Sequence, residues 1–120
     1  MQVLYKSTRG NGETVTASQA ILKGLSEDGG LFVPTVIPSL DVPAERLAQM
    51  SYQETAYEVM SRFLTDFTEE ELKSCISRAY DSKFDTEEIA PLHKADGVYF
   101  LELFHGATIA FKDMALSILP

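Results

Sequence analysis

The chain has 120 residues, of which 45% are hydrophobic and 23% charged, an ordinary balance for one soluble globular domain. Its formal net charge of -8 argues against nucleic acid and anionic membranes as partners, because both favour basic patches. The apolar runs are too short to cross a bilayer and residues 1–10 lack a signal-peptide stretch, so we expect a cytoplasmic protein. The single cysteine, Cys75, excludes an internal disulfide and a cysteine-based zinc site, and its helical, apolar surroundings predict a buried small hydrophobe.

The first third of the sequence predicts two short strands and one short helix. A strand over residues 3–8 is followed by a turn at residues 9–12, because Asn-Gly and paired glycines readily adopt positive φ. A helix follows, capped by Thr16 or Ser18. After the next glycine pair, residues 31–33 predict a brief strand that leads into a proline-rich, extended connection.

Two capping boxes predict the beginnings of the two longest helices. Ser51 and Glu54 form the first box, and Thr68 and Glu71 form the second. In each, the hydroxyl accepts an early backbone N–H and the glutamate reaches back to the cap residue. An apolar stripe at helical spacing follows each box. A shorter helix is expected over residues 44–50, directly after a proline.

The last part of the sequence predicts a loop, a strand, a turn and a helix. Residues 85–96 are polar and predict a loop. Residues 97–104 are rich in aromatic and branched side chains and predict a buried strand. A glycine turn at residues 105–106 then leads to a helical pattern over residues 111–119.

The irregular alternation of helices and short strands indicates an α+β fold. We expect residues 1–96 to form a small N-terminal domain. Residues 97–120 have a different character and predict the first strand, turn and helix of a second, α/β domain. Pro120 directly follows an apolar helical run, so we expect the natural polypeptide to continue beyond it.

The residues most able to take part in a reaction are concentrated in residues 101–113, where a strand and a glycine turn place Lys112 at the start of a helix. Partial desolvation and the positive end of the helix dipole both favour the neutral amine. A neutral amine can attack an aldehyde to form a Schiff base, which suits pyridoxal phosphate. From these residues alone, an ordinary lysine that pairs with Asp113 or with solvent is the alternative. No metal site is expected.

The stretch LFHGATIAFKD, residues 103–113, resembles the cofactor-lysine signature of threonine synthases, usually LFHGPTxAFKD. Residues 5–10 resemble the start of that family, and residues 20–34 resemble its first helix and following turn. The resemblance covers essentially the whole chain and is strongest for fungal and bacterial members with a long N-terminal domain. It implies that residues 97–120 begin the α/β domain of a fold-type II pyridoxal-phosphate enzyme. Ala107 stands where the family usually has proline, a change that loosens the turn but removes no reacting group.

The resemblance also implies roles for individual residues. Lys112 would carry the cofactor and then shuttle protons at the substrate's Cα and Cβ. Phe111 would stack on the pyridine ring, with a core aromatic as the alternative. His105 and Thr108 would line the site or hydrogen-bond the turn. Arg9 would approach a phosphate, with a surface salt bridge as the alternative.

The family reaction converts O-phospho-L-homoserine and water into L-threonine and phosphate, the last step of threonine biosynthesis. It eliminates the γ-phosphate and adds water at Cβ. Both the leaving group and the cofactor need donor-rich phosphate cradles, and no glycine-rich loop of that kind occurs in this sequence. The cradle is therefore expected in a C-terminal part of the same polypeptide, and this chain alone should be inactive and should not bind the cofactor tightly.

Two other functions fit the sequence. A threonine synthase-like phospho-lyase would share this region but release a keto acid instead of adding water. A non-catalytic interaction domain would instead use the apolar residues 114–119 as a partner-binding helix.

Overall fold

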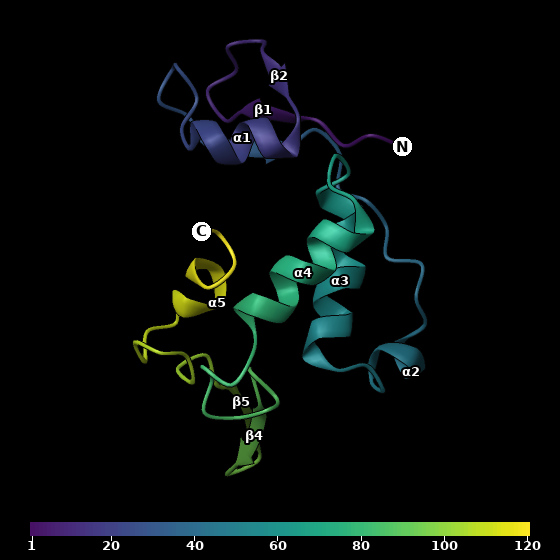
Figure 1. The fold of residues 1–120 in the computed structure, drawn as a ribbon, viewed down its shortest axis with the longest axis vertical. Coiled ribbons are helices and arrows are strands. Elements are labelled where there is room, and N and C mark those ends of the chain that lie inside the picture. Colours follow the sequence, from purple (N-terminus) through teal and green to yellow (C-terminus); the bar gives the residue numbers. More distant parts are fainter. The chain divides into compact units, whose positions relative to one another are not determined.

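The computed structural model describes all residues, 1–120, and contains five helices and five short strands (Figure 1). The mixture confirms the predicted α+β class. The chain forms two compact units that interleave in sequence, and helices α3 (Tyr52–Phe63) and α4 (Glu69–Ala79) contribute residues to both. The first unit holds residues 1–43 and 58–72, and the second holds residues 44–57 and 73–120. The domain boundary predicted between residues 96 and 97 stays a prediction.

The first unit contains a three-stranded antiparallel sheet in the order β2-β1-β3. The central strand β1 (Tyr5–Ser7) pairs on one side with β2 (Thr14–Val15) and on the other with β3 (Phe32–Pro34). Strand β1 lies within its predicted range of residues 3–8, and β3 is displaced by one residue from its predicted range of residues 31–33. Strand β2 was not predicted, because two residues are too few to show an alternating pattern.

Helix α1 (Ala17–Lys23) of the first unit begins at the predicted cap. The Thr16 backbone N–H donates to Gln19 Oε1 at 3.0 Å, and the Gln19 N–H returns a bond to the Thr16 hydroxyl, which makes a complete capping box. The carboxylate of Asp66 accepts a further bond from the Ser18 N–H at 3.0 Å. Gly24 ends the helix with a φ of 71°, a conformation that favours glycine.

Both predicted capping boxes of the long helices are confirmed. Ser51 N–H donates to Glu54 at 2.8 Å and Thr68 N–H donates to Glu71 at 2.8 Å, while each glutamate N–H returns a bond to the hydroxyl. The short helix α2 (Ala44–Leu47) lies within its predicted range. Cys75 is half-buried, so the prediction of a buried small hydrophobe is wrong.

Tyr80 lies at the centre of the second unit's core, which also contains Ile76, Ala79, Phe84 and Ile89. The Tyr80 hydroxyl donates to the Met114 carbonyl at 2.6 Å. The Tyr80 carbonyl accepts a bond from the Gln53 amide at 2.7 Å. Burial raises the pKa of the Tyr80 phenol well above its ordinary value, so the phenol stays a hydrogen-bond donor.

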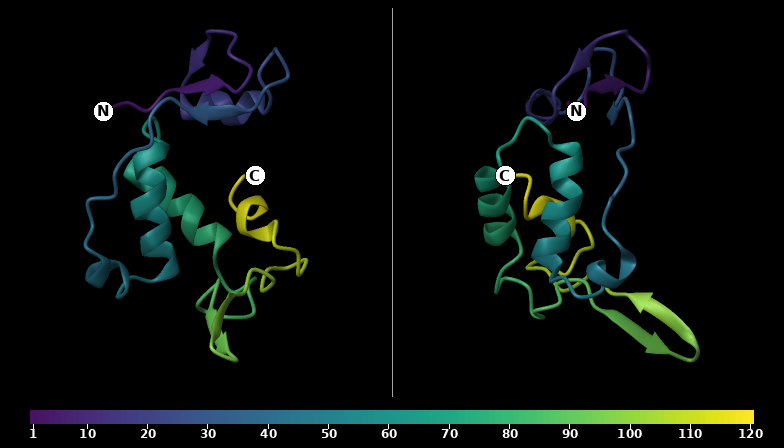
Figure 2. Two further views of the ribbon diagram at one scale, coloured as in Figure 1. Left: turned by 180° about the vertical axis from the view of Figure 1, so that it is seen from behind. Right: turned by 90° about the vertical axis from the view of Figure 1, so that its right-hand side faces the viewer.

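A two-stranded antiparallel hairpin, β4 (Leu92–Ala95) and β5 (Val98–Leu101), also belongs to the second unit (Figure 2). Asp96 and Gly97 connect the strands with φ angles of 50° and 79°, as a two-residue hairpin turn requires. The loop predicted over residues 85–96 is therefore wrong at its C-terminal end, where β4 lies. The prediction of a buried strand over residues 97–104 is also wrong: β5 is shorter and all four of its residues are exposed.

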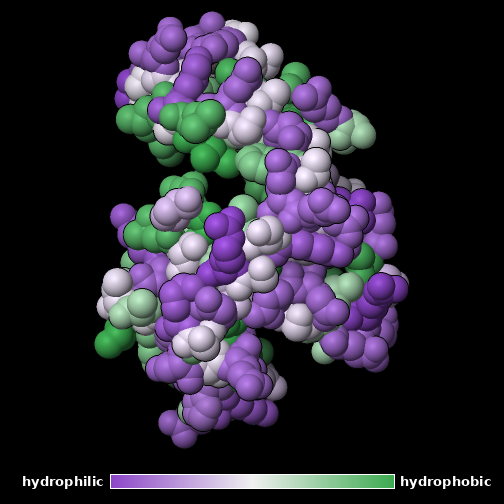
Figure 3. All heavy atoms as spheres, in the orientation of Figure 1, coloured by the Kyte–Doolittle hydropathy of each residue, from purple (hydrophilic) through white to green (hydrophobic).

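Apolar side chains also reach the surface of the first unit. Figure 3 shows them gathered around α1 on the face drawn, and Leu22, Leu25 and Leu31 are all exposed. No helix combines the length and apolar character that crossing a membrane requires.

Truncation of Ile76, in the core of the second unit, should destabilise the chain much more than truncation of Ile37, an exposed residue of the first unit. Ile76 is 2% exposed and Ile37 is 75% exposed. Ile76→Ala should lower the free energy of unfolding by about 2–5 kcal/mol, because it removes packed atoms and leaves a cavity. The matched control Ile37→Ala should change it by less than about 0.5 kcal/mol. Urea unfolding followed by circular dichroism measures both, and equal effects would contradict this description of the core.

Candidate functional site

Lys112 lies at the start of helix α5 (Asp113–Leu116), a single turn that is shorter than the helix predicted over residues 111–119. The Lys112 carbonyl accepts the Leu116 N–H at 2.8 Å and the Ala115 N–H at 3.0 Å. The Lys112 side chain is exposed. The predicted partial desolvation of Lys112 is therefore wrong for this structure, and one helical turn supplies little of the predicted dipole.

The buried carboxylate of Asp113 closes the loop that precedes Lys112. It accepts the Thr108 backbone N–H at 2.8 Å and the Thr108 hydroxyl at 2.6 Å. Gly106 packs so closely that a Cβ there would lie 2.5 Å from Asp113 Cβ. Asp113 thus pairs with Thr108 near the start of the helix. These contacts fix the backbone on both sides of the lysine.

His105 lies at the beginning of the same loop, and both of its ring nitrogens face carboxylates. Nε2 lies 2.7 Å from Glu102 Oε2, and Nδ1 contacts Asp85 Oδ1. The Asp85 backbone N–H also donates to the His105 carbonyl at 3.0 Å. The hydrogen bond with Glu102, with a further contribution from Asp85, raises the pKa of His105 although partial burial opposes the shift. Both ring nitrogens thus bond within the chain, and the predicted role of His105 in the site stays a prediction.

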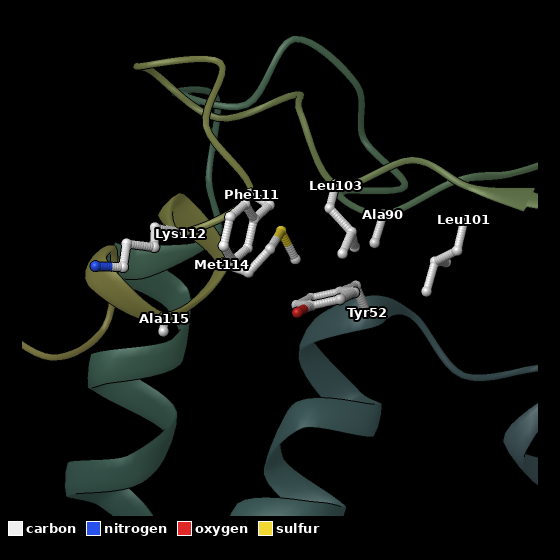
Figure 4. Close-up of a pocket in the computed structure, with 8 residues that line it drawn as sticks. All are labelled: Tyr52, Ala90, Leu101, Leu103, Phe111, Lys112, Met114 and Ala115. Atoms are coloured by element: carbon white, nitrogen blue, oxygen red, sulfur yellow. The ribbon is translucent and has the colours of Figure 1, made fainter.

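An open, apolar hollow of about 550 Å³ adjoins Lys112 in the second unit. Figure 4 shows that Phe111, Met114, Leu103 and Tyr52 point toward one another, while the Lys112 amine points away from them. Three small or aliphatic residues complete the lining: Ala90, Leu101 and Ala115. Phe111 is 70% exposed, so in this chain it is not the core aromatic that was the alternative. Its predicted role against a cofactor ring stays a prediction.

Arg9 belongs to the first unit, whereas the other predicted site residues belong to the second. Its guanidinium donates to the backbone carbonyl of Asp28 at 2.8 Å. The Asp28 carboxylate accepts the Ser7 hydroxyl at 2.6 Å, and this bond lowers the pKa of Asp28. Arg9 therefore braces the turn at Asp28, and its role toward a phosphate stays a prediction.

Three residues that shape the site were not singled out from the sequence: Tyr80, Asp85 and Glu102. Tyr80 and Asp85 lie far from Lys112 in the sequence, and only the tertiary structure brings them into contact with Met114 and His105. Glu102 precedes His105 by three residues, yet this spacing signals a side-chain pair only in a helix. No group of three or more His, Cys, Asp or Glu side chains is arranged to hold a metal ion.

Comparisons with known proteins agree on one family. The family described as Threonine synthase N terminus matches residues 4–80. Threonine synthase of Schizosaccharomyces pombe is 44% identical over 122 residues, which cover 98% of this chain and 24% of that protein. Threonine synthase-like 2 of Homo sapiens is 37% identical, over 94% of this chain and 24% of that protein.

A solved structure agrees in both sequence and fold. The crystal structure of pyridoxal-phosphate-bound threonine synthase from Brucella melitensis matches with a TM-score of 0.85 and 34% identity, covering 98% of this chain and 26% of that chain. The chain therefore spans about a quarter of the length of the relatives it matches.

The contacts of Asp113 predict that the Thr108 hydroxyl stabilises the loop before Lys112. Thr108→Val removes this donor at nearly constant volume and should lower the free energy of unfolding by about 1–2 kcal/mol. The control Thr108→Ser keeps the hydroxyl and should recover most of that loss. Chemical denaturation of the three proteins measures the difference, and a valine variant as stable as the serine variant would contradict the assignment.

Proposed function

Because the chain belongs to the family of threonine synthase N termini, we propose that it is the N-terminal part of a pyridoxal-phosphate-dependent threonine synthase. The whole enzyme would convert O-phospho-L-homoserine and water into L-threonine and phosphate. One observation carries the proposal: the exposed amine of Lys112 lies within the LFHGATIAFKD segment, at the edge of an apolar hollow. The likeness to a pyridoxal-phosphate-bound threonine synthase over 98% of the chain supports it.

The residues present fit one part of a pyridoxal-phosphate site. A covalently held cofactor needs a free primary amine, and Lys112 has one that is exposed. An aromatic ring needs an apolar surface, and the exposed ring of Phe111 beside the hollow offers one. When bound, the cofactor supplies an electron sink for negative charge at the substrate's Cα.

Within the enzyme we assign the chemical role to Lys112. Its amine would hold the cofactor and then move protons at Cα and Cβ of the substrate, the steps that elimination of phosphate and addition of water require. Phe111 would contact the cofactor ring. Thr108 and Arg9 remain proposed substrate contacts, although each already donates within the chain, to Asp113 and to the Asp28 carbonyl.

The remaining part of the site would come from the rest of the same polypeptide, which we propose as this chain's partner. Two phosphate groups need clusters of backbone N–H donors, and the glycine pairs of this chain lie in turns of the first unit. A carbon–oxygen lyase assembled in this way would act in the cytoplasm on a small phosphorylated amino acid. The 120-residue chain alone would be inactive.

A phospho-lyase that releases a keto acid is the second candidate. The 37% identity to human threonine synthase-like 2 favours keeping it. The two reactions differ in whether water is added at Cβ after phosphate has left, and the residues of this chain are compatible with both.

Product analysis of the full-length enzyme tests the proposal. With pyridoxal phosphate and O-phospho-L-homoserine it should release phosphate and form equimolar threonine. Lys112→Ala should lower the rate by at least about a thousandfold, because no other group of this segment replaces the amine. The control Lys94→Ala, an exposed lysine on β4, should keep the rate, and the 120-residue chain should form no product. A keto acid in place of threonine would establish the lyase, and an active Lys112→Ala enzyme would refute both assignments.

A further inference from the structure

The arrangement around His105 restricts the protonation state of its ring. A neutral imidazole donates from one nitrogen and accepts at the other, whereas the imidazolium donates from both. Here Nδ1 faces Asp85 and Nε2 faces Glu102. A carboxylate offers only acceptors. Both contacts therefore exist together only with the imidazolium.

We infer that His105 is a positioning residue for the Lys112 segment: as an imidazolium it fastens the start of that segment to the loop that follows α4, and it does not bind substrate. The ring is occupied on both sides, so no nitrogen is left for a ligand. The effect on catalysis rests on the function proposed above, whereas the fastening itself does not.

Backbone contacts carry the position of His105 to the lysine. The Asp85 N–H binds the His105 carbonyl at 3.0 Å. The next residue, Gly106, is buried against Asp113, the neighbour of Lys112. A shift of the His105 backbone would therefore move Gly106 against a buried carboxylate, and the start of α5 would have to follow.

The fastening depends on pH. Asp85 and Glu102 are the charged groups that face His105, and the Phe104 ring lies beside it at 4.5 Å between centroids. Because the folded chain raises the pKa of His105, both contacts are fully present below the ordinary value of about 6.5 and weaken as the pH rises through the folded value. The Asp85 side chain is 74% exposed and that of Glu102 only 25%. Asp85 should therefore separate first, since its carboxylate returns to water more easily.

An NMR titration of the two histidines, His93 and His105, tests the fastening in the 120-residue chain. His93→Gln leaves a single imidazole signal, which identifies His105. Its midpoint should lie above about 6.5. Glu102→Gln should lower that midpoint, and Asp85→Asn should lower it less. The Asp85 change affects an exposed side chain, so it tests the inference even if the Glu102 variant does not fold.

Kinetics of the full-length enzyme test the positioning role. His105→Gln should lower kcat by about tenfold to a hundredfold, as misplacement of a reacting group does, and should change KM for the phosphorylated substrate by less than about twofold. The matched control His93→Gln, on the exposed strand β4, should leave both constants unchanged.

Two results would overturn the inference. One is a His105 midpoint at or below about 6.5 that the carboxylate variants do not move. The other is a His105→Gln enzyme whose KM rises while kcat stays the same, which would make His105 a substrate ligand. A failure of the proposed function looks different: the Lys112→Ala enzyme would remain active while the titration still gave a raised midpoint.

Discussion

The hydrogen bond from the buried hydroxyl of Tyr80 to the carbonyl of Met114 holds helix α5, and with it Lys112, against the core of the second unit. Helix α5 is a single turn, and a helix this short is not stable by itself. Tyr80, which directly follows α4, holds α5 in place, and the ring of Tyr52 in α3 packs against the Tyr80 ring at 4.8 Å between centroids. A hydrogen bond of this kind contributes about 0.5–1.5 kcal/mol to stability. A residue far from Lys112 in the sequence thus helps to set its place.

The contacts around Lys112 indicate which parts of the proposed active site this chain would supply. His105 and Asp113 hold the backbone before and after the loop, while the lysine amine itself is free of the core. Phe111 and the strand β5 are exposed, although apolar side chains are normally buried. This chain would supply the amine of Lys112, on a backbone fixed by hydrogen bonds, and an apolar surface. The rest of the polypeptide would supply phosphate donors and the cover over that surface.

Local signals in the sequence predicted the local parts of the fold. The capping boxes at Ser51 and Thr68 placed two helices because each box is complete within four residues. The hairpin was missed, although Asp96 and Gly97 form a typical hairpin turn signal; the polar residues before them concealed β4. Burial depends on the whole fold, so the exposure of β5 could not be read from its composition. The same holds for the contact between His105 and Asp85, which joins residues 20 positions apart.

The identity of the residue that carries the cofactor tests the central claim most directly. The full-length enzyme, saturated with pyridoxal phosphate, would be reduced with sodium borohydride, digested with a protease and analysed by mass spectrometry. The structure and the proposed function predict one modified peptide, which spans α5 and carries the pyridoxyl group on Lys112. A pyridoxyl group on any other lysine, with Lys112 unmodified, would contradict the account.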